Sequence, residues 1–175
     1  MNSSKLSSLL FTLSWIFISQ ASGHALYEQV CADTKEDQNC CLNLLKTEPQ
    51  ITTATKDFEL CQLILELGIK KATEAQDHIK EIMKTNPSPA IKECATFDYD
   101  GVVASFKSSL GELTLDTMTS NYDAKTAGDG PTTCDTALAN AKIHNPVLST
   151  LNREIMLLSK IAFLATNRLP VKLSG

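Results

Sequence analysis

Between residues 58 and 82, apolar side chains recur every three or four positions, and this row restricts the fold more than any other part of the sequence. Such spacing places them on one face of an α-helix, while charged residues occupy the other faces. The row consists of Phe58, Cys61, Leu65, Gly68, Ala72, Ala75, Ile79 and Ile82. The prolines of Asn86-Pro87-Ser88-Pro89 then end the segment. The pattern predicts one long helix with its apolar face in a bundle.

Three later segments show the same helical periodicity, over residues 88–113, 116–142 and about 148–169. The sequence Gly-Asp-Gly-Pro at 128–131 interrupts the second of them, and Pro131 suits the first turn of a new helix. Strand-like alternation of any length is absent from the sequence. We therefore predict an all-α fold, an antiparallel four-helix bundle whose helices are joined by short connections.

Two short segments of helical character, residues 25–32 and 39–46, precede the bundle and flank a polar turn at 34–38. Helices this short are marginal by themselves, so we expect them to form a hairpin that depends on a crosslink. We assign the hairpin to residues 24–50 and the bundle to residues 51–175. Together they are the right size for one domain with a single core.

Residues 1–23 are predicted to be a cleaved signal peptide. Lys5 precedes an apolar run over residues 6–18, and the small residues Ala21 and Gly23 follow it two positions apart, as signal peptidase prefers. The run is shorter than the ~20 residues that a membrane-spanning helix needs. We therefore expect a secreted protein whose mature chain begins near His24.

All six cysteines lie beyond this segment, at positions 31, 40, 41, 61, 94 and 134. An even number of cysteines in a secreted chain indicates disulfides, although six cysteines allow fifteen pairings. A bond from Cys31 to either Cys40 or Cys41 would close a small loop and hold the hairpin together. The sequence has no C-x-x-C pair, and its histidines are scattered away from the cysteines, so we expect no metal site.

No catalytic motif is recognisable. The chain lacks G-x-S-x-G, H-E-x-x-H and a glycine-rich phosphate loop, and His78 and His144 are predicted to be exposed. Oxidising conditions also consume thiols that a cysteine enzyme would need. We therefore expect a protein that is not an enzyme and needs no cofactor.

Cleavage of the signal peptide would remove one of the 16 Lys and Arg and none of the 20 Asp and Glu, so the formal charge changes from −4 to −5. An acidic surface argues against nucleic acid and anionic membranes as partners and favours a basic protein. A small secreted helical protein that binds a lipid or another ligand is an alternative. Plant lipid-transfer proteins share an adjacent pair like Cys40-Cys41, but this chain lacks their C-x-C pair.

An ordered set of short motifs resembles the plant invertase and pectin methylesterase inhibitor family, which includes related pollen allergens. Cys31 is followed by Cys41-Leu42-Asn43-Leu44-Leu45, and a break at Asn86-Pro87 precedes Lys92-Glu93-Cys94. Thr133-Cys134-Asp135 and Asn167-Arg168-Leu169 complete the set. The resemblance covers essentially the whole mature chain. It implies a bundle with an N-terminal hairpin and disulfides Cys31–Cys41 and Cys94–Cys134, with Cys40 and Cys61 left unassigned.

The resemblance also implies an extracellular role in the plant cell wall, or apoplast, as an inhibitor of pectin methylesterase or of acid invertase. Invertase-directed members often carry Pro-Lys-Phe after an aspartate, whereas this chain has Thr117-Met118-Thr119 after Asp116. This departure favours pectin methylesterase as the target. The expected partner-binding residues are Asp116, Asn121, Tyr122, Asp123, Lys125 and Asp129.

Overall fold

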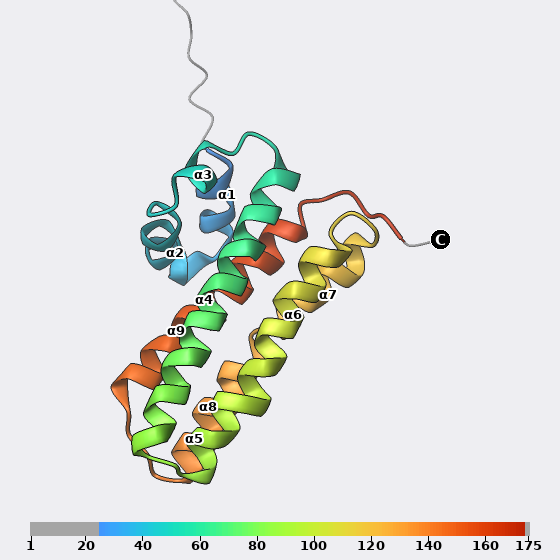
Figure 1. Cartoon of the computed structure of the whole chain (residues 1–175). Coiled ribbons are helices and arrows are strands. Elements are labelled where there is room, and N and C mark those ends of the chain that lie inside the picture. Colours follow the sequence, from blue (N-terminus) through green and yellow to red (C-terminus); the bar gives the residue numbers. More distant parts are fainter. Residues whose placement is uncertain (1–24, 174–175) are drawn as a thin grey trace, which may run out of the picture.

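The computed structural model describes residues 25–173, and every regular element within this range is helical. Figure 1 shows long rods packed side by side, with a group of short helices at one end. The predicted all-α bundle with an N-terminal helical appendage is confirmed. The predicted signal peptide lies outside the described residues. Within them, no helix combines the length and the hydropathy needed to cross a bilayer.

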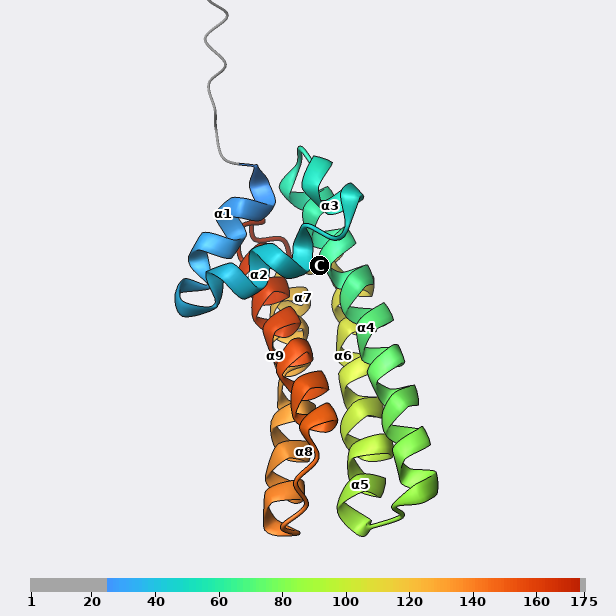
Figure 2. The ribbon, with the colours of Figure 1, turned by 90° about the vertical axis from the view of Figure 1, so that its left-hand side faces the viewer.

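Four rods form the bundle. The first is α4 (Asp57–Thr85), and the second joins α5 (Pro89–Glu93), the π-helical turn η2 (Cys94–Asp98) and α6 (Tyr99–Glu112). The third consists of α7 (Thr117–Thr126) and α8 (Asp129–Asn140), and the fourth is α9 (Pro146–Thr166). Because short loops join successive rods, consecutive rods run antiparallel (Figure 2).

Side-chain caps fix where three of these rods begin. The Asp116 carboxylate accepts hydrogen bonds from the backbone N–H groups of Met118 (3.0 Å) and Thr119 (2.9 Å) at the start of α7. Asn145 caps α9 and Ser88 caps α5 in the same way, each followed by a proline at the first helical position. These caps satisfy N–H groups that have no partner within the helix.

The apolar row of α4 faces the core as the periodicity predicts, with one exception. The six positions from Cys61 to Ile79 are buried, and Ile82 is half-buried. Burial of a large aliphatic side chain such as Leu65 stabilises the fold by about 1.5–3 kcal/mol. The expectation that Phe58 belongs to the core is wrong, because its side chain is 41% exposed. The first turn of α4 extends beyond the other rods, and the C-terminal segment around Pro170 lies beside it.

The second rod contains a π-helical turn that the periodicity did not predict. One side chain of another rod satisfies a carbonyl inside this turn, and a second bonds to Tyr99, the residue that follows it. Gln76 of α4 donates to the carbonyl of Ala95 (3.1 Å) inside η2 and to the carboxylate of Asp100 (2.6 Å). Tyr99 donates to Asn152 of α9 (2.8 Å), and Asn152 donates to Asp135 of α8 (2.6 Å). This buried polar network ties the four rods together.

The predicted break in the third rod is narrower than the Gly128–Pro131 sequence suggested. Only residues 127 and 128 separate α7 from α8, and Pro131 lies in the first turn of α8. The buried hydroxyl of Ser159 on α9 donates to the carbonyls of Ala124 (2.8 Å) and Lys125 (3.0 Å) at the break. Both α7 and α8 pack on α9, so the third rod continues along one side of the bundle.

The appendage consists of α1 (Leu26–Asp33), the 3-10 turn η1 (Lys35–Asp37) and α2 (Gln38–Leu45), followed by the short α3 (Pro49–Thr53), which the sequence analysis did not predict. A disulfide joins Cys31 to Cys41 across the hairpin. Arg168, which follows α9, fixes the hairpin to the bundle by bonding to Gln29 (2.8 Å) and Asp57 (2.9 Å).

Gly130 permits a close approach of α8 to η2, and we expect alanine at this position to destabilise the protein. A Cβ there would lie 2.5 Å from Cγ2 of Val102 and 2.6 Å from the carbonyl oxygen of Asp98. Because a backbone oxygen cannot easily move aside, Gly130→Ala should lower the free energy of unfolding by about 1–3 kcal/mol, measured by urea denaturation with the disulfides intact.

Gly101→Ala is the matched control, because nothing lies within 4 Å of a Cβ at that position. Alanine there should be neutral or stabilise by up to about 1 kcal/mol through helix propensity. Equal stability of the two variants would contradict the close contact.

Candidate functional site

The six residues expected to bind a partner lie on α7, at its N-cap and at the start of α8, but they do not all face solvent. Asn121 points toward α9, where its amide donates to the carbonyl of Phe163 (2.8 Å) and the hydroxyl of Thr166 (2.9 Å). Asp123 accepts a hydrogen bond from Ser108 of α6 (2.6 Å). These two residues hold α7 between its neighbours, and Asp116 caps it.

The remaining three residues are exposed. Tyr122 is 65% exposed, and Asp129 is exposed at the start of α8. The ammonium of Lys125 lies 5.9 Å from the centre of the Phe163 ring, which orients this side chain along the border with α9. Tyr122 and Asp129 are therefore the expected residues most available to a partner.

Two further apolar residues near the start of α7 are exposed, which the sequence did not predict. Leu115 is 56% exposed and Met118 is 55% exposed. Residues 118 and 122 are one helical turn apart and share a face of α7, and Leu115 lies two residues before the helix begins. We term these three exposed apolar residues the α7 stripe. Their spacing is that of core residues, and the sequence alone therefore gave no sign that they face solvent.

A row of small residues on α6 lies next to the α7 stripe. Gly101, Ala104, Ser108 and Gly111 are all exposed, and the hydrogen bond from Ser108 to Asp123 places this part of the row against α7. Nothing lies within 4 Å of a Cβ at Gly101 or Gly111. The face formed by α6 and α7 is therefore flat on the α6 side and apolar on the α7 side.

The C-terminal segment fixes the first turn of α7 from outside the bundle. The backbone N–H of Thr117 donates to the carbonyl of Lys172 (3.0 Å), and its hydroxyl donates to the carbonyl of Pro170 (3.0 Å). The backbone N–H of Lys172 donates in turn to the Thr117 hydroxyl (2.8 Å), and its ammonium donates to the carbonyl of Thr114. Thr117 therefore has a structural role, whereas Met118 and Thr119 are exposed.

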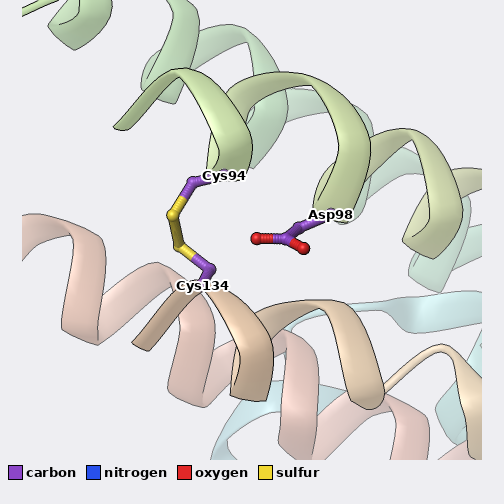
Figure 3. Close-up of side chains that lie close together, drawn as sticks. All are labelled: Cys94, Asp98 and Cys134. Carbon is purple, nitrogen blue, oxygen red and sulfur yellow. A yellow bond between two sulfur atoms is a disulfide. The ribbon is translucent and has the colours of Figure 1, made fainter. Parts of the chain in front are cut away.

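A disulfide joins η2 to α8 through Cys94 and Cys134, beside a buried carboxyl group. Figure 3 shows Asp98 next to this bond, on the η2 side. Asp98 is 4% exposed, and its Oδ2 has no hydrogen-bond partner among residues 25–173. Burial, with a smaller contribution from the charge of Glu93, raises the pKa of Asp98 to about 6.

In the described part of the chain, only one group of three His, Cys, Asp or Glu side chains is close enough to share a metal ion. It consists of Cys94, Asp98 and Cys134. Their ligand atoms lie within 4.8 Å of one another. Because the two sulfurs are bonded to each other, they are not thiolates and do not offer the charge that binds a metal. Only one carboxylate of this group remains available as a ligand.

The two cysteines outside the disulfides differ in environment. Cys61 is buried in α4, and burial raises the pKa of its thiol to about 12, so it is unreactive. Cys40 is exposed on α2. His78 and His144 are also exposed, and neither has a hydrogen-bond partner among the residues that the structure describes. Among the described residues, neither of the two free thiols is therefore hydrogen-bonded to a histidine that could act as its base.

The fold and the two disulfides agree with the comparison of the sequence with known families. The family model of plant invertase/pectin methylesterase inhibitors matches residues 25–164. The chain belongs to this family. No curated protein sequence matches it significantly.

Two solved inhibitor structures share the fold. A mutant form A of a pectin methylesterase inhibitor from Arabidopsis is 20% identical, with a TM-score of 0.74, and the match covers 85% of this chain and 100% of that chain. A pectin methylesterase inhibitor from Arabidopsis thaliana is 21% identical, with a TM-score of 0.61. This match covers 82% of this chain and 95% of that chain. Both cysteine pairs that the resemblance to this inhibitor family implies are disulfides in the structure.

Asp98 should make the stability of this family member depend on pH. Because burial raises the pKa of Asp98 from 3.8 to about 6, the folded state binds this proton more tightly than the unfolded state. The stabilisation is complete below the ordinary pKa and is lost as the pH rises through the folded pKa. Asp98→Asn removes the charge. The free energy of unfolding of the variant should therefore exceed that of the wild type by about 1–3 kcal/mol near neutral pH, and the two values should converge at acidic pH.

Urea denaturation at several pH values between 3.5 and 7.5 measures this effect. Asp129→Asn, which removes an exposed carboxylate from α8, is the control and should leave the profile of the wild type nearly unchanged. A constant difference between Asp98→Asn and the wild type at all pH values would show that the carboxyl does not titrate in this range.

Proposed function

We propose that this protein is a secreted inhibitor that binds a cell-wall pectin methylesterase and blocks the access of its substrate, without catalysing a reaction itself. The observation that carries the proposal is the family match over residues 25–164. It is supported by a fold that two pectin methylesterase inhibitors of Arabidopsis share. The chain would reach the enzyme by secretion into the apoplast after removal of residues 1–23.

Inhibition of this kind needs a rigid surface rather than a reactive group. A preformed face loses little conformational entropy on binding, so more of the contact energy appears as affinity. The polar network around Tyr99 and Asn152 and the bond between Cys94 and Cys134 hold the rods in one arrangement. These features favour the bundle surface, rather than a loop, as the inhibitory element.

The α7 stripe and the small residues of α6 together form the face that we assign to the enzyme. Tyr122 is the expected anchor, because tyrosine supplies a large, stiff contact area and is enriched among residues that dominate binding energy. The flat row on α6 allows the enzyme to approach the helix backbone closely. Lys125 and Asp129 lie at the rim, where charges guide association more than they add affinity.

The formal charge of the mature chain suits a basic enzyme. The chain has 20 Asp and Glu against 16 Lys and Arg, and the predicted cleavage removes one of those lysines. Opposite net charges accelerate association, and the acceleration falls as salt screens them. We therefore expect the association rate to fall with ionic strength.

Acid invertase is the second candidate target, but the segment at 117–119 supports it less. Lysine and phenylalanine would offer a cation and a rigid ring to a glycosidase site lined by carboxylates. Met118 and Thr119 occupy the exposed positions instead and provide neither charge nor ring. The hydroxyl and N–H groups of Thr117 form hydrogen bonds with the C-terminal segment.

The purified protein should inhibit a plant pectin methylesterase stoichiometrically, and Tyr122→Ala should weaken the inhibition by roughly 30-fold, which corresponds to about 2 kcal/mol of lost contact. Because Tyr122 is 65% exposed, the substitution should leave the unfolding midpoint unchanged. Val147→Ala, an exposed apolar residue at the start of α9, is the control and should retain full inhibition. Equal inhibition by both variants would show that Tyr122 does not contribute to binding the enzyme.

Inhibition of acid invertase by the unmodified protein should be weak or absent, and Thr117→Pro/Met118→Lys/Thr119→Phe should improve it. Proline fits the first turn of α7, but it removes the N–H bond and the hydroxyl bonds that Thr117 makes with residues 170–172. The double variant Met118→Lys/Thr119→Phe keeps these bonds and isolates the effect of charge and ring. Tight inhibition of invertase by the unmodified protein would reverse the preferred target.

A further inference from the structure

A cleft of about 640 Å³ lies between the hairpin and the bundle, away from the α6–α7 face. Figure 2 shows α2 crossing in front of α9 and reaching toward α4. Residues of α2 form one wall of the cleft, and residues of α9 with Lys71 of α4 form the other. The volume falls within the range of about 300–1,000 Å³ that small-molecule sites occupy.

Apolar atoms make up most of the surface of this cleft, although many of its lining residues are polar. Leu44 from α2 and Met156 and Leu157 from α9 line it, and all three side chains are only half-buried. A half-buried apolar group gains further free energy when a ligand removes it from water. Methionine adapts its shape to irregular ligands, so this surface does not require one exact fit.

The charged residues that line the cleft are paired, except for one. Lys160 bonds to Asp37 (2.7 Å), and Lys71 bonds to Glu154 (3.0 Å). Glu36 also lies 3.6 Å from the Lys160 ammonium, so the carboxylates at the cleft are engaged by the two lysines. Arg153 lines the same cleft, and its side chain forms no ion pair or hydrogen bond with any of the residues described. Arg153 is therefore the one cation lining the cleft that has no acidic partner among the described residues.

The positions along α9 set the size of a matching ligand. Arg153 and Leu157 are four residues apart, so they lie on the same side of the helix, and Lys160 follows three residues later. At 1.5 Å per residue, the distance along the axis from residue 153 to residue 160 is about 10 Å. A ligand whose carboxylate binds Arg153 would thus place an apolar chain of medium length over Leu157, Met156 and Leu44.

We infer that this cleft binds an amphipathic monocarboxylate of medium-chain fatty acid size, with Arg153 holding the carboxylate and Leu44, Met156 and Leu157 covering the chain. Such a ligand contacts the hairpin and α9 together, so it would brace α2 against the bundle. The site lies apart from the α7 stripe, and ligand binding and enzyme inhibition would be separate activities of one chain. Charge complementarity selects this ligand over an uncharged one.

Isothermal titration of the purified protein with decanoate, below its micelle concentration, tests the inference. The wild type should bind one decanoate, and Arg153→Gln should weaken binding about tenfold or more, because a charge-assisted bond is lost. Lys107→Gln is the matched control, since it removes an exposed, unpaired cation on α6 and changes the net charge equally. Decanol should bind more weakly than decanoate to the wild type.

Alkylation of Cys40 gives a second readout, because this thiol lines the cleft whereas Cys61 is buried. Decanoate should slow alkylation of Cys40 by iodoacetamide in the wild type and should do so less in Arg153→Gln. Arg153→Gln should inhibit pectin methylesterase as well as the wild type does, which keeps a failure here distinct from a failure of the proposed inhibition.

Three results would overturn the inference. The first is equal decanoate affinity in the wild type and Arg153→Gln, and the second is equal affinity of the wild type for decanol and decanoate. The third is a dimer, detected by light scattering, that Arg153→Gln dissociates, because a second copy would then occupy the cleft.

Discussion

The contact between η2 and the start of α8 determines how the second and third rods lie against each other. The backbones approach so closely at Gly130 that a methyl group would collide with the carbonyl of Asp98. The disulfide of Cys94 and Cys134 holds the same two elements together and closes a loop of 40 residues, which stabilises the fold by about 4 kcal/mol in the chain-entropy model. This contact fixes one end of the second and third rods, and the hydrogen bonds of Ser108 with Asp123 and of Ser109 with Ser120 position α6 against α7.

The bundle was predictable because its information is local and periodic. Apolar residues every three or four positions mark the rods, and prolines or capping residues such as Ser88 and Asn145 mark where two of them begin. The π-helical turn was not predictable, because its stability comes from Gln76, which is 19 residues from Ala95 in the sequence. The same reason explains α3, whose five residues carry too short a pattern to recognise.

The candidate face is a prediction from the family resemblance, and the sequence did not show which of its side chains are exposed. The family resemblance places it on the third rod, which stays a prediction, and the structure adds that Tyr122 is exposed there. Sequence alone could not show that Asn121 bonds to Phe163 and Thr166. Hydrogen bonds between rods depend on the orientation of each helix about its own axis. The sequence also could not reveal that Leu115 and Met118 face solvent, since their spacing resembles that of buried residues. The cleft beside Arg153 depends on the docking of the hairpin, which no local pattern encodes.

The bonds of Arg168 have a consequence for the order in which the protein folds. Its guanidinium joins Gln29, which is 139 residues away, and Asp57, which is 111 residues away. A chain that leaves the ribosome from its N-terminus therefore makes the hairpin first and docks it last, after α9 is complete. The bond between Cys31 and Cys41 spans only 10 residues and can form during that interval. The oxidised hairpin is then formed before translation ends, and it docks on the bundle only after Arg168 has been synthesised.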